Sequence, residues 1–269
     1  MAIIVLVVSK TNVKKLKITF LGTGTSQGVP VIACPCAVCH SGNPRDKRLR
    51  TSILIETSEL TLVIDSGPDF RQQMLRANVL RLDAILFTHE HKDHIAGMDD
   101  IRAYNYIQQQ PMAVYAEERV QKAIRNEFSY VFAEEKYPGI PQVDFFTLKN
   151  SPFEIRGIPV IPIRGMHMKL PVFGFRFGNF AYITDINFIS EEEKEKIKDI
   201  EYLVINGLRK EKHISHYSLG EAISLIEEVK AKNGFITHIS HQMGLHDDVQ
   251  KQLPSNIQLA YDGLVLEID

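Results

Sequence analysis

The sequence has no hydrophobic run long enough to cross a membrane as a helix, which takes about 20 predominantly apolar residues. The apolar stretch Ala2–Val8 is far shorter, and it lacks the basic leader and the small-residue cleavage site of a secretory signal. We therefore expect a cytoplasmic protein that has no membrane partner.

The sequence also lacks an excess of charge of one sign. Its 31 Lys and Arg against 33 Asp and Glu give a formal net charge of −2, which argues against a surface dedicated to nucleic acid. No Gly/Ser-rich linker, low-complexity tract or short repeat interrupts the chain. A hydrophobic content of 44% is ordinary for a globular chain with a sizeable core. We expect one domain over residues 16–269, preceded by an extension at residues 1–15.

Cysteine is scarce, and the three cysteines fall within six positions, at Cys34, Cys36 and Cys39. An odd number of cysteines so tightly clustered is a poor disulfide framework. Thiolates at such short spacing readily share a metal ion, so the cluster predicts a metal site.

Histidine, by contrast, is concentrated in one motif. Directly after an apolar run that predicts a buried strand come four candidate ligands, His89, His91, Asp93 and His94. Side chains two apart point to the same side at a strand end, so His89 and His91 can bind one metal. Asp93 and His94 lie where the chain turns toward a helix that we expect to open at Ile95, and they can face a neighbouring metal.

Short apolar runs alternate with helical patterns along the whole chain. In the first half we expect strands at Lys17–Leu21, Ser52–Glu56, Leu62–Asp65, Ala84–Thr88 and Ala113–Tyr115. In the second half we expect strands at Val160–Arg164, Val172–Arg176, Ala181–Thr184, Tyr202–Ile205, Gly234–Thr237 and Gly263–Ile268. Helices are expected at Phe70–Arg76, Met98–Gln109, Glu117–Asn126, Ser190–Lys198 and Leu219–Lys232. Because the strands come in groups with helices between them, we expect an α/β (α+β) fold of two mixed sheets packed face to face with helices outside.

Three further candidate ligands stand at or just past the ends of predicted strands, namely His167, Asp185 and His238. The early histidine motif needs such partners from elsewhere in the chain to complete its coordination. With them, His89, His91 and His167 would hold a first metal. A second metal would be held by Asp93, His94 and His238, with Asp185 bridging both. Imidazole and carboxylate suit zinc, manganese or iron, and ligand type alone does not choose among these metals.

The motif at residues 89–94 resembles the H-x-H-x-D-H signature of the metallo-β-lactamase superfamily, and the resemblance extends from Leu16 onward. It implies an αββα sandwich and assigns His167, Asp185 and His238 to the later metal-binding motifs. Asp65 matches the first motif, in which a carboxylate usually orients a ligating histidine. From the residues alone, Asp65 could equally be a turn residue.

The glycine-rich segment Gly22–Pro30, followed by Cys34-x-Cys36-x-x-Cys39, is similar to the phosphoribosyl 1,2-cyclic phosphate phosphodiesterase family of phosphonate metabolism. In that family three such cysteines and a histidine near the C-terminus hold a structural zinc, and the matching histidine here is His241. Three thiolates and one imidazole are an established zinc arrangement. His40 is a rival fourth ligand, although its adjacency to Cys39 makes tetrahedral closure awkward.

His216, just ahead of the last predicted helix, resembles a histidine that assists at the scissile phosphate in the cyclic phosphodiesterases and in ribonuclease Z. It would donate a proton to the leaving oxygen or stabilise developing charge. A solvated histidine at the start of a helix is the alternative, and His213 is a weaker candidate for the same role. The Gly22–Gly28 loop could cradle phosphate through its backbone N–H groups.

Together these motifs predict a binuclear metal-dependent phosphodiesterase that acts on a cyclic or other small phosphodiester. A hydroxide held between the two metals would attack phosphorus in line, and Asp185 would bridge the metals and orient this nucleophile. His216 would help the leaving alkoxide, and one additional zinc would be structural. The resemblance also implies a homodimer, to which the apolar N-terminal extension would contribute.

Three other functions stay open at this point. A ribonuclease Z-like RNA endonuclease would carry an extended arm to grip tRNA, and no long basic, Gly-rich insertion is present. A thioesterase of the glyoxalase type would share the metal motifs but would not need the cysteine cluster or His216. A non-catalytic binding protein on a hydrolase scaffold usually loses ligands, whereas every expected ligand type is present here.

Overall fold

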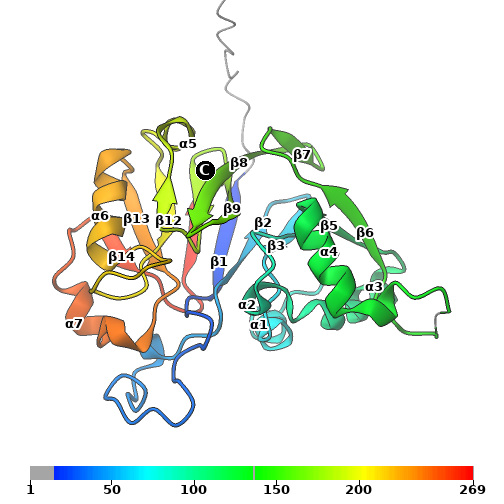
Figure 1. Cartoon of the computed structure of the whole chain (residues 1–269), viewed down its shortest axis with the longest axis horizontal. Coiled ribbons are helices and arrows are strands. Elements are labelled where there is room, and N and C mark those ends of the chain that lie inside the picture. Colours follow the sequence, from blue (N-terminus) through cyan, green and yellow to red (C-terminus); the bar gives the residue numbers. More distant parts are fainter. Residues whose placement is uncertain (1–14, 136, 269) are drawn as a thin grey trace, which may run out of the picture.

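Two β-sheets face each other, and helices cover both outer sides (Figure 1). The computed structural model describes residues 15–135 and 137–268. Its four layers confirm the αββα sandwich expected from the sequence. The predicted extension at residues 1–15 lies outside the described residues except for Lys15. Across the described ranges, no helix has the length and apolar character needed to cross a membrane.

The first sheet has seven strands in the order β15-β1-β2-β3-β4-β5-β6. From β15 to β3 neighbouring strands are antiparallel, and from β3 to β6 they are parallel. The strands are β1 (Leu16–Gly22), β2 (Ser52–Glu56), β3 (Thr61–Ile64), β4 (Ala84–Leu86), β5 (Met112–Ala116), β6 (Val143–Thr147) and β15 (Val265–Ile268).

The second sheet has eight strands and repeats this plan, in the order β11-β8-β9-β10-β12-β13-β14 with β7 paired to β8. Antiparallel pairs run from β11 to β10, and parallel pairs run from β10 to β14. The strands are β7 (Phe153–Ile155), β8 (Ile158–His167), β9 (Leu170–Phe177), β10 (Phe180–Ile183), β11 (Phe188–Ile189), β12 (Tyr202–Asn206), β13 (Asn233–Thr237) and β14 (Ile257–Leu259).

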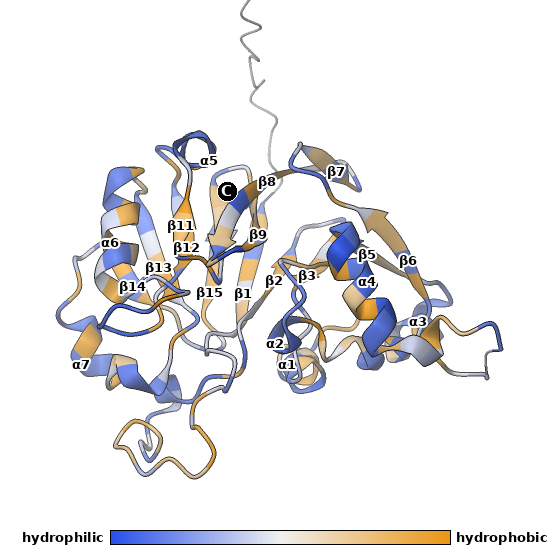
Figure 2. Cartoon of the chain, viewed as in Figure 1, coloured by the Kyte–Doolittle hydropathy of each residue, from blue (hydrophilic) through white to orange (hydrophobic). Residues whose placement is uncertain are grey.

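Each buried strand contributes side chains to two hydrophobic cores, because successive residues of a strand point to opposite faces of the sheet. In β3, Leu62 and Ile64 enter the core between the sheets, while Val63 packs under the helices outside. In β12, Val204 enters the core between the sheets, and Leu203 packs on the opposite side. Figure 2 shows many of these strands in orange, whereas α4 and α6 carry both blue and orange stretches. Both faces of each sheet are therefore buried.

The helices are mostly short. They are α1 (Phe70–Arg76), α2 (Lys92–Ile95), α3 (Arg102–Gln108), α4 (Glu118–Glu127), α5 (Glu191–Glu195), α6 (Leu219–Glu228) and α7 (His246–Gln250). Helix α6 begins with a capping box, in which Ser218 accepts from the backbone of Glu221 and Glu221 accepts from the backbone of Ser218. It ends at Glu228 rather than at the predicted Lys232, because Lys230 takes a left-handed conformation with φ +55°.

Several short elements were not predicted from the sequence, namely β6, β7, β11, β14, α2 and α7. These elements have between two and five residues, too few to show a hydrophobic period of their own. Strand β4 ends at Leu86 rather than at Thr88, because the Thr88 backbone N–H donates to Asp65 Oδ1 at 2.9 Å instead of joining the sheet.

Candidate metal centres

All seven predicted active-site ligands come together where strands of both sheets end. The segment after β4 carries the early motif, β8 ends on a histidine, and β10 and β13 are each followed by a ligand. These ligands are His89, His91, Asp93, His94, His167, Asp185 and His238. Helix α2 already begins at Lys92, so Asp93 and His94 lie within its single turn rather than before a helix opening at Ile95.

Three residues that follow strand ends adopt a left-handed backbone that side chains rarely accept. The φ angles are +65° at Asp65 after β3, +58° at Asp185 after β10 and +56° at His238 after β13. Such conformations cost about 1–3 kcal/mol each, and they persist where the surrounding structure over-determines them, as at active sites. The fold therefore gives up stability to place these three side chains.

One group of possible ligands contains Asp93, His94, Asp185 and His238, with one ligand atom from each lying within 4.8 Å of the others. His238 Nδ1 is 3.0 Å from Asp185 Oδ2. His94 Nε2 is 3.2 Å from Asp93 Oδ2 and 3.4 Å from Asp185 Oδ2. These four residues are the set proposed from the sequence for the second metal together with the shared carboxylate.

The other predicted set, His89, His91 and His167, forms a ring of three adjacent imidazoles. Their ring centroids are 4.5, 5.1 and 5.9 Å apart, and His89 Nε2 is 3.0 Å from His91 Nδ1. Three imidazoles bound tetrahedrally to one ion at about 2.0 Å would have centroids about 5 Å apart. The spacing is therefore that of three side chains able to share one ion. His89 is buried, whereas His91 is exposed, so this set faces solvent on one side.

Hydrogen bonds fix which nitrogen three of the histidines present to the centre. Nδ1 of His94 lies 2.7 Å from the buried Asp65 carboxylate, Nδ1 of His89 lies 2.9 Å from Thr88 Oγ1, and Nδ1 of His167 lies 2.7 Å from the Ser215 carbonyl oxygen. Because Thr88 Oγ1 donates to Asp65 and a carbonyl only accepts, each Nδ1 carries the proton. Each Nε2 is then the nitrogen left to bind a metal, the usual arrangement of a metal-ligating histidine.

The buried polar atoms at the centre fit a cation. No hydrogen bond within the described ranges reaches His94 Nε2, His216 Nδ1 or His238 Nδ1, although these atoms are buried. Buried polar atoms without a partner are rare in native structures, and a bound ion can satisfy them. Burial by itself lowers the pKa of His94, but the Asp93, Asp65 and Asp185 carboxylates outweigh it and hold that pKa well above its usual value. The cluster thus carries an excess of negative charge that favours a positive partner.

His216 lies beside this cluster, just before α6. Its ring is 4.5 Å from the His167 ring and 4.7 Å from the His238 ring, and its Nδ1 is 3.8 Å from Asp185 Oδ1. Burial and the neighbouring His238 lower the pKa of His216 to about 3, against the opposing effect of Asp185. His167, Asp185 and His216 also form a group whose ligand atoms lie within 4.8 Å of one another, so His216 could act as a ligand as well as a catalytic group.

A second candidate centre is formed by Cys34, Cys36, Cys39 and His241, whose ligand atoms lie within 4.8 Å of one another. The sulfurs of Cys34 and Cys36 are each 3.3 Å from His241 Nδ1. Sulfur and nitrogen bound tetrahedrally to one zinc are about 3.5 Å apart, so the observed spacing suits a shared ion. The backbone N–H of Cys39 and the side chain of His241 lower the pKa of Cys36 to about 6, which favours its thiolate.

His241 begins a 3₁₀ turn (His241–Met243) only three residues after His238, so one short segment contributes to both centres. This segment is tied to the glycine-rich loop by hydrogen bonds of the Ile239 backbone to Thr23 and Thr25. The cysteine cluster is therefore placed to hold the strand end that carries His238.

Three backbone amides of the glycine-rich loop are already used within the protein and so are not free for the phosphate cradle considered from the sequence. Its amides at Gly24, Thr25 and Gly28 already donate to the carbonyl oxygens of Leu49, Ile239 and Thr25, respectively. A Cβ on Gly22 would lie 1.9 Å from the Arg50 carbonyl oxygen. Close packing against residues 48–50 is thus the reason for glycine here.

Sequence reasoning did not identify Thr88 and Ser215, because nothing in their local pattern marks them as hydrogen-bond partners of histidines.

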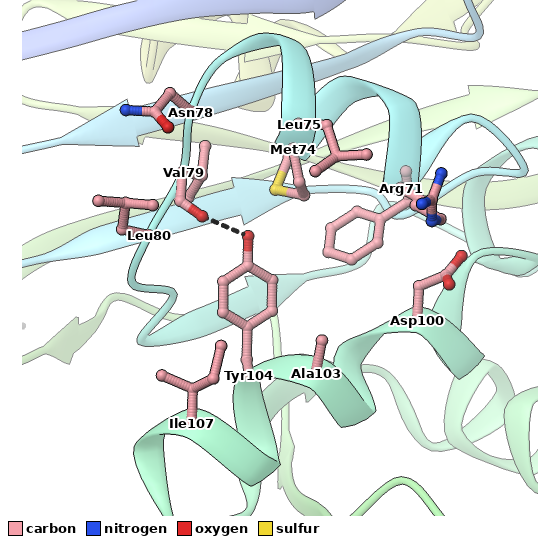
Figure 3. A pocket seen from close by; sticks show the side chains of 11 residues that line it. Arg71, Met74, Leu75, Asn78, Val79, Leu80, Asp100, Ala103, Tyr104 and Ile107 are labelled. Carbon is pink, nitrogen blue, oxygen red and sulfur yellow. Dashed lines mark hydrogen bonds between the residues drawn. The ribbon is translucent and has the colours of Figure 1, made fainter.

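A cavity of about 400 Å³ lies on the outer side of the first sheet, between α1 and α3 (Figure 3). Its walls are mostly apolar, with Met74, Leu75, Leu80 and Ile107 among them, and Tyr104 Oη donates to the Val79 carbonyl oxygen across it at 2.8 Å. None of the candidate metal ligands lines this cavity.

Comparison with known proteins agrees with this geometry. Residues 61–239 match the beta-lactamase superfamily domain. The chain is similar to a crystallised diphosphatase from the PhnP family, with 38% identity and a TM-score of 0.89 over 94% of this chain and 97% of that one. The expected resemblance to the superfamily and to this family is thereby confirmed.

Two curated proteins are also similar to parts of the chain. One, named octanoyltransferase, from Porphyromonas gingivalis, is 42% identical over 257 residues, which are 94% of this chain but 52% of that protein. The chain thus spans about half the length of this relative. A ribonuclease Z from Bradyrhizobium diazoefficiens is 34% identical over 83 residues, which are 30% of this chain and 22% of that enzyme.

Proposed function

Because the chain belongs to the beta-lactamase superfamily, close to its PhnP family, we propose that it is a metal-dependent phosphodiesterase acting on a small phosphodiester. The observation that carries the proposal is the convergence of seven imidazole and carboxylate donors, with His216 beside them, at one solvent-facing edge. The 38% identity to a diphosphatase supports a reaction at phosphorus rather than at a β-lactam or a thioester.

Two divalent cations, zinc or manganese or alternatively iron, would be held by two sets of residues that share one carboxylate. His89, His91 and His167 would hold the first, Asp93, His94 and His238 the second, and Asp185 would contribute to both. Such a pair supplies Lewis acidity and makes water acidic enough to act as a nucleophile near neutral pH.

The residues of the chain then have separable tasks. Asp185, whose carboxylate accepts a 2.6 Å hydrogen bond from Thr184 Oγ1, would orient the attacking water. Asp65 and the Ser215 carbonyl keep the protons of His94 and His167 on Nδ1. His216, mostly neutral at pH 7, would donate an N–H to the leaving oxygen and stabilise its developing charge.

The cysteine cluster would hold one structural zinc through Cys34, Cys36, Cys39 and His241. A closed set of three thiolates and one imidazole leaves no open position for a substrate, which is the mark of a structural site. Its role would be to order residues 31–41 and, through the segment 238–241, to steady His238.

The direct test is the Asp185→Asn variant, assayed on bis(p-nitrophenyl) phosphate with added zinc, manganese or iron. Asparagine tolerates the positive φ at this position, so the backbone should be preserved. Loss of the shared carboxylate should reduce kcat by about 100-fold or more. Near-normal turnover by the variant would refute the assignment. Asp262→Asn is a matched control, because Asp262 is a buried carboxylate outside the cluster.

Ribonuclease Z-like RNA cleavage is the second candidate, favoured by the 83 residues that are 34% identical to a ribonuclease Z. Cleavage of a precursor tRNA in preference to a 2′,3′-cyclic nucleotide would support it.

The similarity to the protein named octanoyltransferase does not lead us to propose octanoyl transfer. Nearly half of that relative lies outside the match, and the three cysteines here are grouped with His241 rather than free as acyl-accepting nucleophiles.

A further inference from the structure

Three exposed apolar side chains belong to segments that each also supply a residue of the candidate active site. Met168 follows His167, Phe188 stands three residues after Asp185, and Ile214 stands two residues before His216. Their exposed fractions are 53%, 57% and 74%. We call these three side chains the apolar rim.

One side chain, that of Asn187, holds the three segments together. Its Oδ1 accepts from the Met168 backbone N–H at 2.8 Å, and its Nδ2 donates to the Ile214 carbonyl oxygen at 2.9 Å. Its backbone N–H donates to the Met166 carbonyl oxygen at 2.9 Å, and Phe188 is the next residue along the chain. The rim is therefore fixed relative to His167 and His216.

Met168 occupies a backbone position that favours glycine. It begins the two-residue turn between β8 and β9, where His167 pairs with Leu170, and its φ is +57°. The first position of such a hairpin turn normally goes to glycine when φ is positive. Because the Met168 side chain is exposed, it contributes little hydrophobic stabilisation. The stability of the fold therefore does not explain why methionine occupies this strained position. Strain of this kind is concentrated at ligand clamps and active sites.

We propose that the apolar rim binds a flat, uncharged ring, such as a nucleobase, carried on one arm of the phosphodiester substrate. An aromatic ring and a thioether are suited to stacking and sulfur–aromatic contacts with such a ring. A bare sugar phosphate offers mostly hydroxyl groups and charge, and it has less apolar surface than a nucleobase for the rim to contact. This inference rests on the proposed phosphodiesterase function and narrows its substrate class to nucleotide-like diesters.

The test compares two diesters that share the p-nitrophenolate leaving group but differ in the other arm. One is the p-nitrophenyl ester of thymidine 5′-monophosphate, and the other is methyl p-nitrophenyl phosphate. The variants are Met168→Gly, Phe188→Ser, Ile214→Ser and the combination of all three. Leu80→Ser is the matched control, because Leu80 is 76% exposed on the cavity of Figure 3, away from the site residues.

For the combined variant, the ratio of kcat/KM for the thymidine ester to that for the methyl ester should fall about tenfold, mainly through KM. Leu80→Ser should keep the wild-type ratio. Met168→Gly should unfold at the wild-type temperature or above, because glycine accepts the positive φ, which separates loss of binding from loss of folding.

A ratio within twofold of wild type in the combined variant would overturn the proposal, as would an equal fall in Leu80→Ser. A changed oligomeric state at an unchanged ratio would overturn it in favour of a protein-docking surface. Binding of thymidine 5′-monophosphate, measured by calorimetry, separates the two proposals. If wild type turns over neither ester, the phosphodiesterase proposal fails, and equal nucleotide affinity of wild type and combined variant then rejects the rim as well.

Discussion

Replacing Asp65 by asparagine should weaken metal binding while leaving every proposed ligand in place. The buried Asp65 carboxylate accepts from the Thr88 N–H at 2.9 Å, from Thr88 Oγ1 at 2.8 Å and from His94 Nδ1 at 2.7 Å. A carboxamide places an NH₂ group where one carboxylate oxygen stood, so at least one of these three donors loses its acceptor. The charge-assisted hydrogen bond that fixes the His94 ring is also weakened.

The expected effect on metal affinity is a 10- to 100-fold loss, about 1.4–2.8 kcal/mol, as is typical when the partner of a ligating histidine is removed. Asparagine is the informative substitution because it tolerates the φ of +65° at this position, whereas alanine would add backbone strain. The loss can then be assigned to the carboxylate and not to the turn.

The assay is competition for zinc between the protein and a chromophoric chelator, together with urea unfolding of the metal-free protein. Asp83→Asn is the matched control. Asp83 is also buried and accepts from the Thr61 N–H at 2.9 Å, but it precedes β4, whereas His89 follows that strand. Both variants should be less stable, and only Asp65→Asn should lose affinity. The reasoning is wrong if Asp65→Asn binds zinc within twofold of wild type, or if Asp83→Asn loses as much.

Three further predictions concern the cysteine cluster, His216 and His246. Cys36→Ser should release one zinc per chain and lower the unfolding temperature, and elemental analysis showing unchanged zinc would remove the structural site. His216→Ala should lower kcat while the metal content of the active site stays constant, whereas loss of a metal would make His216 a ligand. Burial, together with Arg48 and Arg45, lowers the pKa of His246 to about 4, so this imidazole is neutral in the folded protein. An unfolded histidine titrates near 6.5, so the contribution of His246 to stability should be constant above about pH 6.5 and fall by about 1–3 kcal/mol toward pH 4. His246→Gln, which can still accept from Arg48, should flatten that slope in urea unfolding, and an unchanged slope would contradict the assignment.

Much of the fold follows from patterns that a short window of sequence contains. The strand at Ser52–Glu56 and the helix at Phe70–Arg76 have the bounds predicted for them. The strand is a short apolar run between polar residues, and the helix buries Phe70 and Met74, which are four positions apart and so lie on one face. Strands β7 and β11 were missed, since two or three residues cannot show a period. Their existence depends on the neighbouring β8, with which both pair.

The sequence by itself determined the chemical types of the donors and their local spacing. Histidines at positions 89, 91 and 94 with Asp93, and cysteines at 34, 36 and 39, are close together along the chain, so few bonds separate them and their proximity is guaranteed.

Only the tertiary structure decided which residues from distant parts of the chain lie beside these clusters, and which ring nitrogen of each histidine carries the proton. His241 reaches Cys34 across 207 positions, and His167 finds its proton acceptor in the Ser215 carbonyl 48 positions away. Asn187 joins Met168 to Ile214 in the same manner. Such contacts depend on how two sheets pack and where their strands end, which is a property of the assembled cores and not of any local pattern.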